Sequence, residues 1–155
     1  MVEEFRFVVK DIEILKKFNL DSTRARNITD FYLTRSKRVR YYAKTNKEAE
    51  HFVLIVAEPG SRIKKNKAIT RREVNELIKA SILTIEKKGI GHITVLDKEG
   101  YAEQVKVFIK KSKASIIDET QIEFEESNKI IPALSKEFEP IKIIRQGLFD
   151  YAQNQ

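Results

Sequence analysis

The chain has 155 residues, the size of one domain, and it carries a formal net charge of +7 with 34% charged residues. It contains no cysteine, which excludes disulfides, thiolate metal sites and cysteine nucleophiles and fits a cytoplasmic protein. An apolar run of about 18 residues and a signal-peptide pattern are both absent, so we expect no membrane span and no export. We therefore predict a single domain over residues 1–155 in the cytoplasm. Its positive charge favours anionic partners such as phosphates, nucleotides or nucleic acid.

The stretch 2–9 alternates charged and apolar residues with the period of two that is typical of a strand. Glu4 and Arg6 fall on one side of this strand, whereas Phe5 and the following apolar residues fall on the other. A helix is expected next, over residues 11–18, with one apolar stripe that could lie across the aromatic side of the strand.

Two further strands are expected at 27–34 and 36–43, and the short gap between them predicts a hairpin. Each carries polar or charged residues on one face and mainly apolar residues on the other. The polar face of the first includes Asp30, and a face of the second includes arginines. Asp30 and Tyr32 share one face of the first strand, and Arg38, Arg40 and Tyr42 share one face of the second.

The middle of the chain changes pattern. Residues 51–57 are apolar on both faces, which predicts a strand covered on both sides. The basic stretch 61–67 has little periodicity, and we interpret it as an exposed loop. Thr70 and Glu73 have the spacing of a capping box, and the apolar face of the helix that they begin continues to Ile85.

The second half contains another predicted hairpin, formed by residues 92–96 and 105–110. A later strand, 120–125, places two carboxylates, Glu123 and Glu125, on the same face. This strand is the acidic counterpart of the first strand. A last helix is expected between these residues and Pro140, which makes about seven or eight strands and three helices in all.

Two architectures can use strands that are charged on one face. A two-layer sheet would turn the charges toward water, whereas a closed barrel with helices outside would bring them together in one channel. In such a channel carboxylates could hold Mg²⁺ or Mn²⁺ and arginines could neutralise a polyphosphate. The residues that would converge are Glu4, Arg6, Asp30, Arg38, Arg40, Lys106, Glu123 and Glu125.

In the order of its motifs the chain resembles the CYTH family, also known as triphosphate tunnel metalloenzymes. That family opens with Glu-x-Glu-x-Lys and continues with an Asp-x-Tyr pair, an Arg-x-Arg pair and a late Glu-x-Glu strand. The matching positions here are Glu4-x-Arg6, Asp30-x-Tyr32, Arg38-x-Arg40 and Glu123-x-Glu125. The chain differs from the family at Val2, in place of the first glutamate, and at Ala57, in place of a lysine. The resemblance implies an α+β fold with a closed, antiparallel, eight-stranded β-barrel and helices packed on its outside.

The resemblance also implies a site inside the tunnel. Its metal ligands would be Glu4, Glu123 and Glu125, which would hold Mg²⁺ or Mn²⁺. Its phosphate-binding residues would be Arg6, Arg38, Arg40 and Lys106. The expected ligand is a triphosphate-containing small molecule or nucleotide, and the expected chemistry is that of a metal-dependent phosphohydrolase or an adenylyl cyclase. No catalytic residue is identified.

Two alternatives remain open. The first is a non-catalytic module that binds a polyanion or nucleic acid, with basic residues beside Tyr32, Tyr41 and Tyr42 pairing phosphate contacts with base stacking. The second is a degenerate tunnel that serves as an interaction scaffold, in line with the changes at Val2 and Ala57. Neither histidine is assigned a role.

Overall fold

The computed structural model describes residues 3–10, 13, 20–23, 25–57, 64–96, 102–112, 118–126, 138–144 and 147–153. The nine strands and two helices of this described part are, in chain order, β1 (Glu3–Val9), β2 (Ile28–Thr34), β3 (Lys37–Tyr42), β4 (His51–Ala57), β5 (Lys64–Ala68), α1 (Arg71–Ile78), β6 (Leu83–Leu96), β7 (Ala102–Ser112), β8 (Asp118–Glu126), β9 (Lys142–Ile144) and α3 (Leu148–Gln153).

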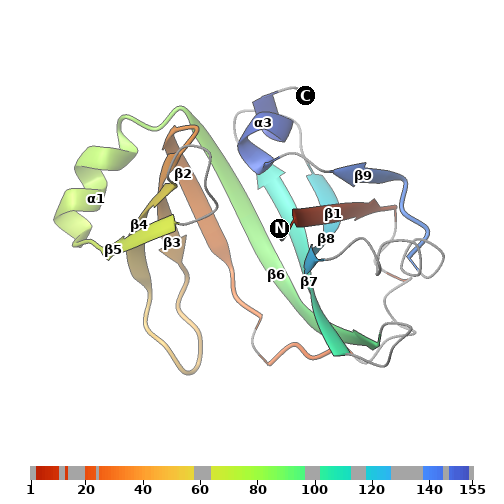
Figure 1. The fold of residues 1–155 in the computed structure, drawn as a ribbon. Coiled ribbons are helices and arrows are strands. Elements are labelled where there is room, and N and C mark those ends of the chain that lie inside the picture. The colour runs from red at the N-terminus through yellow and green to blue at the C-terminus, as the bar shows by residue number, and fades with distance from the viewer. Residues whose placement is uncertain are drawn as a thin grey trace. The chain divides into compact units, whose positions relative to one another are not determined.

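The chain divides into two compact units. Unit 1 consists of Met1–Ala25, Gly89–Lys110 and Asp118–Gly147. Unit 2 consists of Arg26–Lys88, Lys111–Ile117 and Leu148–Gln155. The long strand β6, drawn in green in Figure 1, contributes its first residues to unit 2 and its later residues to unit 1.

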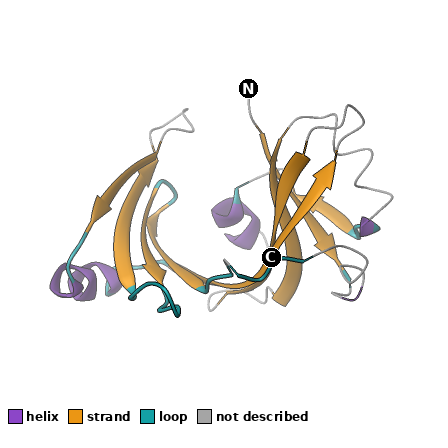
Figure 2. Ribbon diagram, turned by 90° about the horizontal axis from the view of Figure 1, so that it is seen from below, coloured by secondary structure: helices purple, strands orange, loops and turns teal. Residues whose placement is uncertain are grey.

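Unit 2 contains an antiparallel sheet in the order β5-β4-β3-β2-β6. The predicted hairpin of β2 and β3 is confirmed, with Phe31 opposite Val39. Helix α1 contacts β2 and β3, and α3 lies against β2, where Phe149 meets Tyr32 at a ring distance of 5.3 Å. Figure 2 shows these two helices on opposite sides of the strands. Val39 and Tyr32 lie on opposite faces of the sheet and both are buried.

Unit 1 contains a three-stranded antiparallel sheet in the order β8-β1-β9, and β7 lies between β6 and β8 in the hydrogen-bonded order. The predicted strands over residues 2–9 and 120–125 are therefore confirmed as β1 and β8. Phe7 is fully buried and packs edge-on against Phe138 at 6.5 Å, beside the equally buried Ile122. Phe7 and Val9, on the apolar side of the first strand, thus belong to the core.

The prediction of a closed eight-stranded barrel is wrong. The strand order begins at β5 and ends at β9, and within the described residues these two strands do not pair with each other. Closure requires the first and last strands to be hydrogen-bonded at a fixed stagger. Alternating charge along a strand determines only which face is polar, so the same pattern fits an open arrangement of sheets.

Two predicted segments differ from the structure. The basic stretch that we expected to be a loop contains β5, which pairs with β4 and is exposed at every position. It has no hydrophobic period because neither face is buried. Helix α1 begins at the predicted capping box but ends at Ile78, and Leu83 already belongs to β6. Pairing of Leu83 with Tyr32 in β2 takes these residues into the sheet.

Other expectations are met in part. Strand β4 forms as predicted, but it is not covered on both sides, since Ile55 is its one buried residue and its other apolar residues are half-buried. The helices expected over residues 11–18 and before Pro140 lie almost entirely outside the described residues. In the part of the chain that the structure describes, no helix is long and apolar enough to cross a membrane.

Candidate anion-binding site

A buried carboxylate, that of Asp30, lies at the centre of a group of charged side chains on one face of the sheet of unit 2. The register of β2 and β3 places Asp30 directly opposite Arg40. On its other side β6 places Ile85 opposite Asp30, with Lys87 two residues further on and on the same face. Arg38 shares the face of Arg40 for the same reason. We call Asp30, Arg38, Arg40 and Lys87 the charged cluster.

Three cations surround the one carboxylate of the cluster. Arg40 makes a two-point ion pair, in which Nε donates to Oδ1 of Asp30 at 2.7 Å and Nη2 donates to Oδ2 at 3.1 Å. Lys87 Nζ lies 2.8 Å from Oδ2, and Arg38 Nε lies 3.8 Å from the same oxygen. The side chain of Asp30 has no exposed surface, whereas those of Arg38 and Arg40 keep 16% and 18%. The two arginines therefore contact the buried carboxylate of Asp30 and extend from it toward the surface.

Arg38 also interacts with an aromatic neighbour. Its Nη1 donates to the hydroxyl of Tyr32 at 2.7 Å, and its guanidinium lies 5.3 Å from the centre of the same ring. The Nε of Arg38 is buried and donates no hydrogen bond to any described residue. A guanidinium has five N–H donors, and Arg38 directs one of them to Tyr32. The side chain of Arg38 is 16% exposed, so donors on its Nη atoms can reach an acceptor from outside the cluster.

The surroundings fix the charges of the cluster. Burial by itself raises the pKa of Asp30, but the charge of Lys87, the hydrogen bond from Arg40 and the charge of Arg38 outweigh it, and this pKa lies well below its ordinary value. Burial lowers the pKa of Arg40, yet its contacts with Asp30 prevail and raise it. Burial raises the pKa of Tyr32 and keeps its hydroxyl neutral. Near neutral pH Asp30 is therefore an anion, Arg40 is a cation and Tyr32 is neutral.

Two stacked rings adjoin the charged cluster on the same face of the sheet. Tyr42 at the end of β3 lies opposite His51 at the start of β4, and their rings stack at 4.6 Å with 15° between their planes. The guanidinium of Arg40 is 5.9 Å from the centre of the Tyr42 ring, and that of Arg26 is 5.0 Å from it. We call Tyr42 and His51 the ring pair.

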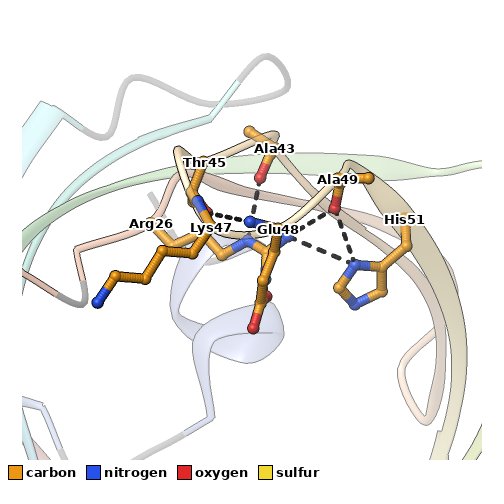
Figure 3. Close-up of polar contacts among 7 residues, drawn as sticks. All are labelled: Arg26, Ala43, Thr45, Lys47, Glu48, Ala49 and His51. Atoms are coloured by element: carbon orange, nitrogen blue, oxygen red, sulfur yellow. Dashed lines mark hydrogen bonds and ion pairs between the residues drawn. The ribbon is translucent and has the colours of Figure 1, made fainter.

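Arg26 connects the ring pair to the loop between β3 and β4 (Figure 3). Its Nε donates to the carbonyl of Ala43 at 3.0 Å and its Nη2 to the carbonyl of Ala49 at 3.1 Å, while its Nη1 pairs with Glu48. The same Nη2 lies 3.4 Å from Nδ1 of His51. One side chain thus holds both ends of the loop.

The structure brings two of the predicted phosphate-binding residues, Arg38 and Arg40, together around Asp30. It adds Lys87 and His51, to which the sequence assigned no role. Lys87 continues the alternation of Leu83 and Ile85 along β6, but that alternation is hidden by the helical spacing of the preceding residues. For His51 the one signal is its position at the start of an apolar strand.

The remaining predicted positions lie on strands of unit 1. The register of β1 and β8 places Arg6 opposite Glu123 and Glu4 opposite Glu125, and Lys106 lies in β7. The side chains of Glu4, Lys106, Glu123 and Glu125 are outside the described residues. Among the side chains that are described, no group of three His, Asp or Glu residues could hold a metal ion.

Comparison with known proteins gives structural likenesses. No protein-family model matches the chain, and no curated protein matches it. Among solved structures, the chain is similar to a conserved hypothetical protein from Pyrococcus furiosus, with 16% identity, a TM-score of 0.57, and coverage of 97% of this chain and 99% of that chain. It is also similar to the hypothetical protein NE1496, with 17% identity, a TM-score of 0.49, and coverage of 86% and 82%. The first of these likenesses shows a shared fold.

Proposed function

We propose that this protein binds a phosphorylated small molecule, a triphosphate or a nucleotide, at the charged cluster. The observation that carries the proposal is the fully buried Asp30, which holds three cations on one face of a sheet while the side chains of Arg38 and Arg40 remain partly exposed. Planar guanidinium groups match the oxygens of phosphate in pairs, and their charge does not depend on pH in the physiological range. An anion with several oxygens is the ligand that best complements this arrangement.

Asp30 has a positioning role in this site. Arg38 and Arg40 are two residues apart on β3 and would repel each other without a carboxylate between them. Their contacts with Asp30 fix the direction of both side chains before a ligand arrives. Binding to groups that are already ordered loses less conformational entropy than binding to free side chains.

The test is titration calorimetry with tripolyphosphate. The variant Arg38→Gln should bind about tenfold to a hundredfold more weakly, because a hydrogen bond between charged groups contributes about 1.5–3 kcal/mol. Arg71→Gln is the matched control, since it removes the same charge from an exposed arginine at the start of α1. Wild-type affinity should also fall with added salt. An Arg38→Gln variant that binds as tightly as Arg71→Gln would refute the proposed site.

The metal and the hydrolytic activity implied by the CYTH resemblance form a separate proposal. The paired strands β1 and β8 bring Glu4 opposite Glu125 and place Glu123 beside Arg6, and carboxylate oxygens suit Mg²⁺ or Mn²⁺. A cation held by these three glutamates would polarise a phosphoryl group or activate water. The test is hydrolysis of tripolyphosphate, ATP and thiamine triphosphate with each metal. Activity that persists in Glu123→Gln would exclude the assignment.

The arrangement of the tyrosines supports a small ligand over the alternative of a nucleic-acid strand. Tyr32 and Tyr42 lie on the face of the charged cluster, but Tyr41 lies on the other face, where its ring meets Phe52 at 5.0 Å and its hydroxyl bonds to Glu50. The three rings therefore do not form one stacking surface. Salt-sensitive binding of a single-stranded oligonucleotide that is lost in Tyr41→Leu would favour the alternative.

A further inference from the structure

The ring pair and the charged cluster are continuous on one face of the sheet. Arg40 joins them, because its guanidinium binds both oxygens of Asp30 and also lies 5.9 Å from the centre of the Tyr42 ring. Along β3 the residues Arg38, Arg40 and Tyr42 are two apart, so the row that they form spans roughly 13 Å on one side of the strand. A ligand with a charged end and an aromatic end fits such a row.

The ring pair is available to a ligand. One face of the His51 ring lies on Tyr42, and His51 is an exposed residue that an incoming ring can reach. Imidazole and phenol rings both serve as stacking surfaces for planar bases in other proteins.

The loop behind the ring pair is ordered by its own hydrogen bonds. The backbone N–H of Thr45 donates to the carbonyl of Glu48 at 2.9 Å, and the Thr45 hydroxyl accepts from the N–H groups of Lys47 and Glu48 at 3.3 and 3.0 Å. Arg26, which precedes β2, then joins this loop to His51 (Figure 3). The rings are therefore in place before binding, which lowers the entropic cost of stacking.

We propose that Tyr42 and His51 form a stacking subsite that takes the planar aromatic ring of the phosphorylated ligand, with a nucleobase as the ring and the phosphates on Arg40 and Arg38. This inference rests on the proposed phosphate site and adds the chemical class of the rest of the ligand. An inorganic polyphosphate would use the charged cluster alone, whereas a nucleoside triphosphate would use both parts of the face.

The experiment compares ATP with tripolyphosphate by titration calorimetry at one salt concentration. In His51→Leu the affinity for ATP should fall about fivefold to a hundredfold, the range expected for loss of one stacked base, while the affinity for tripolyphosphate stays the same. His51→Phe keeps a stacking ring and should retain ATP binding. The matched control is Tyr41→Leu, which removes a ring from the opposite face of β3. Each variant is also checked by thermal unfolding.

The outcomes separate the two proposals. If His51→Leu lowers the affinity for ATP and for tripolyphosphate equally, or lowers neither affinity, the stacking subsite is excluded and the phosphate site stands. ATP binding that is lost in Tyr41→Leu but kept in His51→Leu would exclude it as well. If the wild-type protein binds neither ligand, the proposed function itself fails, and the subsite fails with it. A drop confined to ATP and restored by His51→Phe is the result that supports the inference.

Discussion

Replacing the buried carboxylate tests the account of the charged cluster most directly. The substitution Asp30→Asn keeps the size and shape of the side chain but removes its charge. It deprives Arg38, Arg40 and Lys87 of the carboxylate charge that they share, at a position that has no exposed surface. The effect on stability should therefore be far larger than that of a surface charge.

The expected loss is about 3–5 kcal/mol, the usual cost of removing one partner of a buried ion pair. This is a large part of the free energy of unfolding of an ordinary domain, which is roughly 5–15 kcal/mol. Glu50→Gln provides the comparison for the loss of stability. The side chain of Glu50 is 41% exposed, and its Oε1 lies 3.5 Å from Nη1 of the exposed Arg71. Loss of a surface pair of this kind costs about 0–1 kcal/mol.

The assay is urea denaturation at a series of pH values. The pKa of Asp30 in the folded protein lies below its unfolded value of about 3.9. Its carboxylate therefore contributes its full stabilisation above that pH, and the contribution is lost as the pH falls toward the folded pKa. The gap between wild type and Asp30→Asn should be constant near neutrality and shrink below about pH 4. A gap under about 1 kcal/mol at neutral pH, or one that does not change in acid, would refute the reasoning.

Substitutions at three further positions test the fold by urea denaturation. Thr70→Ala should destabilise the protein by about 1 kcal/mol because it removes the N-cap of α1, and Thr70→Ser should restore most of this. Gly91→Ala should cost about 1–3 kcal/mol, since a Cβ there would lie 2.6 Å from the carbonyl oxygen of Asp21; an unchanged midpoint would contradict this close approach. Phe7→Ala should cost about 3–5 kcal/mol through loss of its packing against Phe138, and a cost near zero would place Phe7 outside the core.

Patterns in the sequence correctly predicted those elements that are set by interactions between residues close together along the chain. Alternation placed Asp30 and Arg40 on matching faces of a hairpin, which the register of β2 and β3 confirms. The spacing of Thr70 and Glu73 predicted the start of α1, because a capping box needs only residues three apart. These features depend on neighbours along the chain or across a short turn.

The end of α1 and the start of β6 depended on distant residues. Ser81 to Ile85 continue the apolar spacing of the helix, but pairing with β2 takes Leu83 and Ile85 into the sheet. Lys87 then reaches Asp30, although the two residues are far apart in the sequence. A helical period says nothing about whether a strand elsewhere in the chain competes for the same residues.

The sequence by itself determined the β2–β3 hairpin, the charged faces of its two strands and where α1 begins. The tertiary structure alone decided that the strand order is open between β5 and β9, and that Lys87 and His51 join the face of Asp30. The physical reason is the distance along the chain over which each interaction acts. Alternation and capping act between near neighbours, whereas sheet closure and the partners of a buried carboxylate are set by strands that meet only in the folded chain.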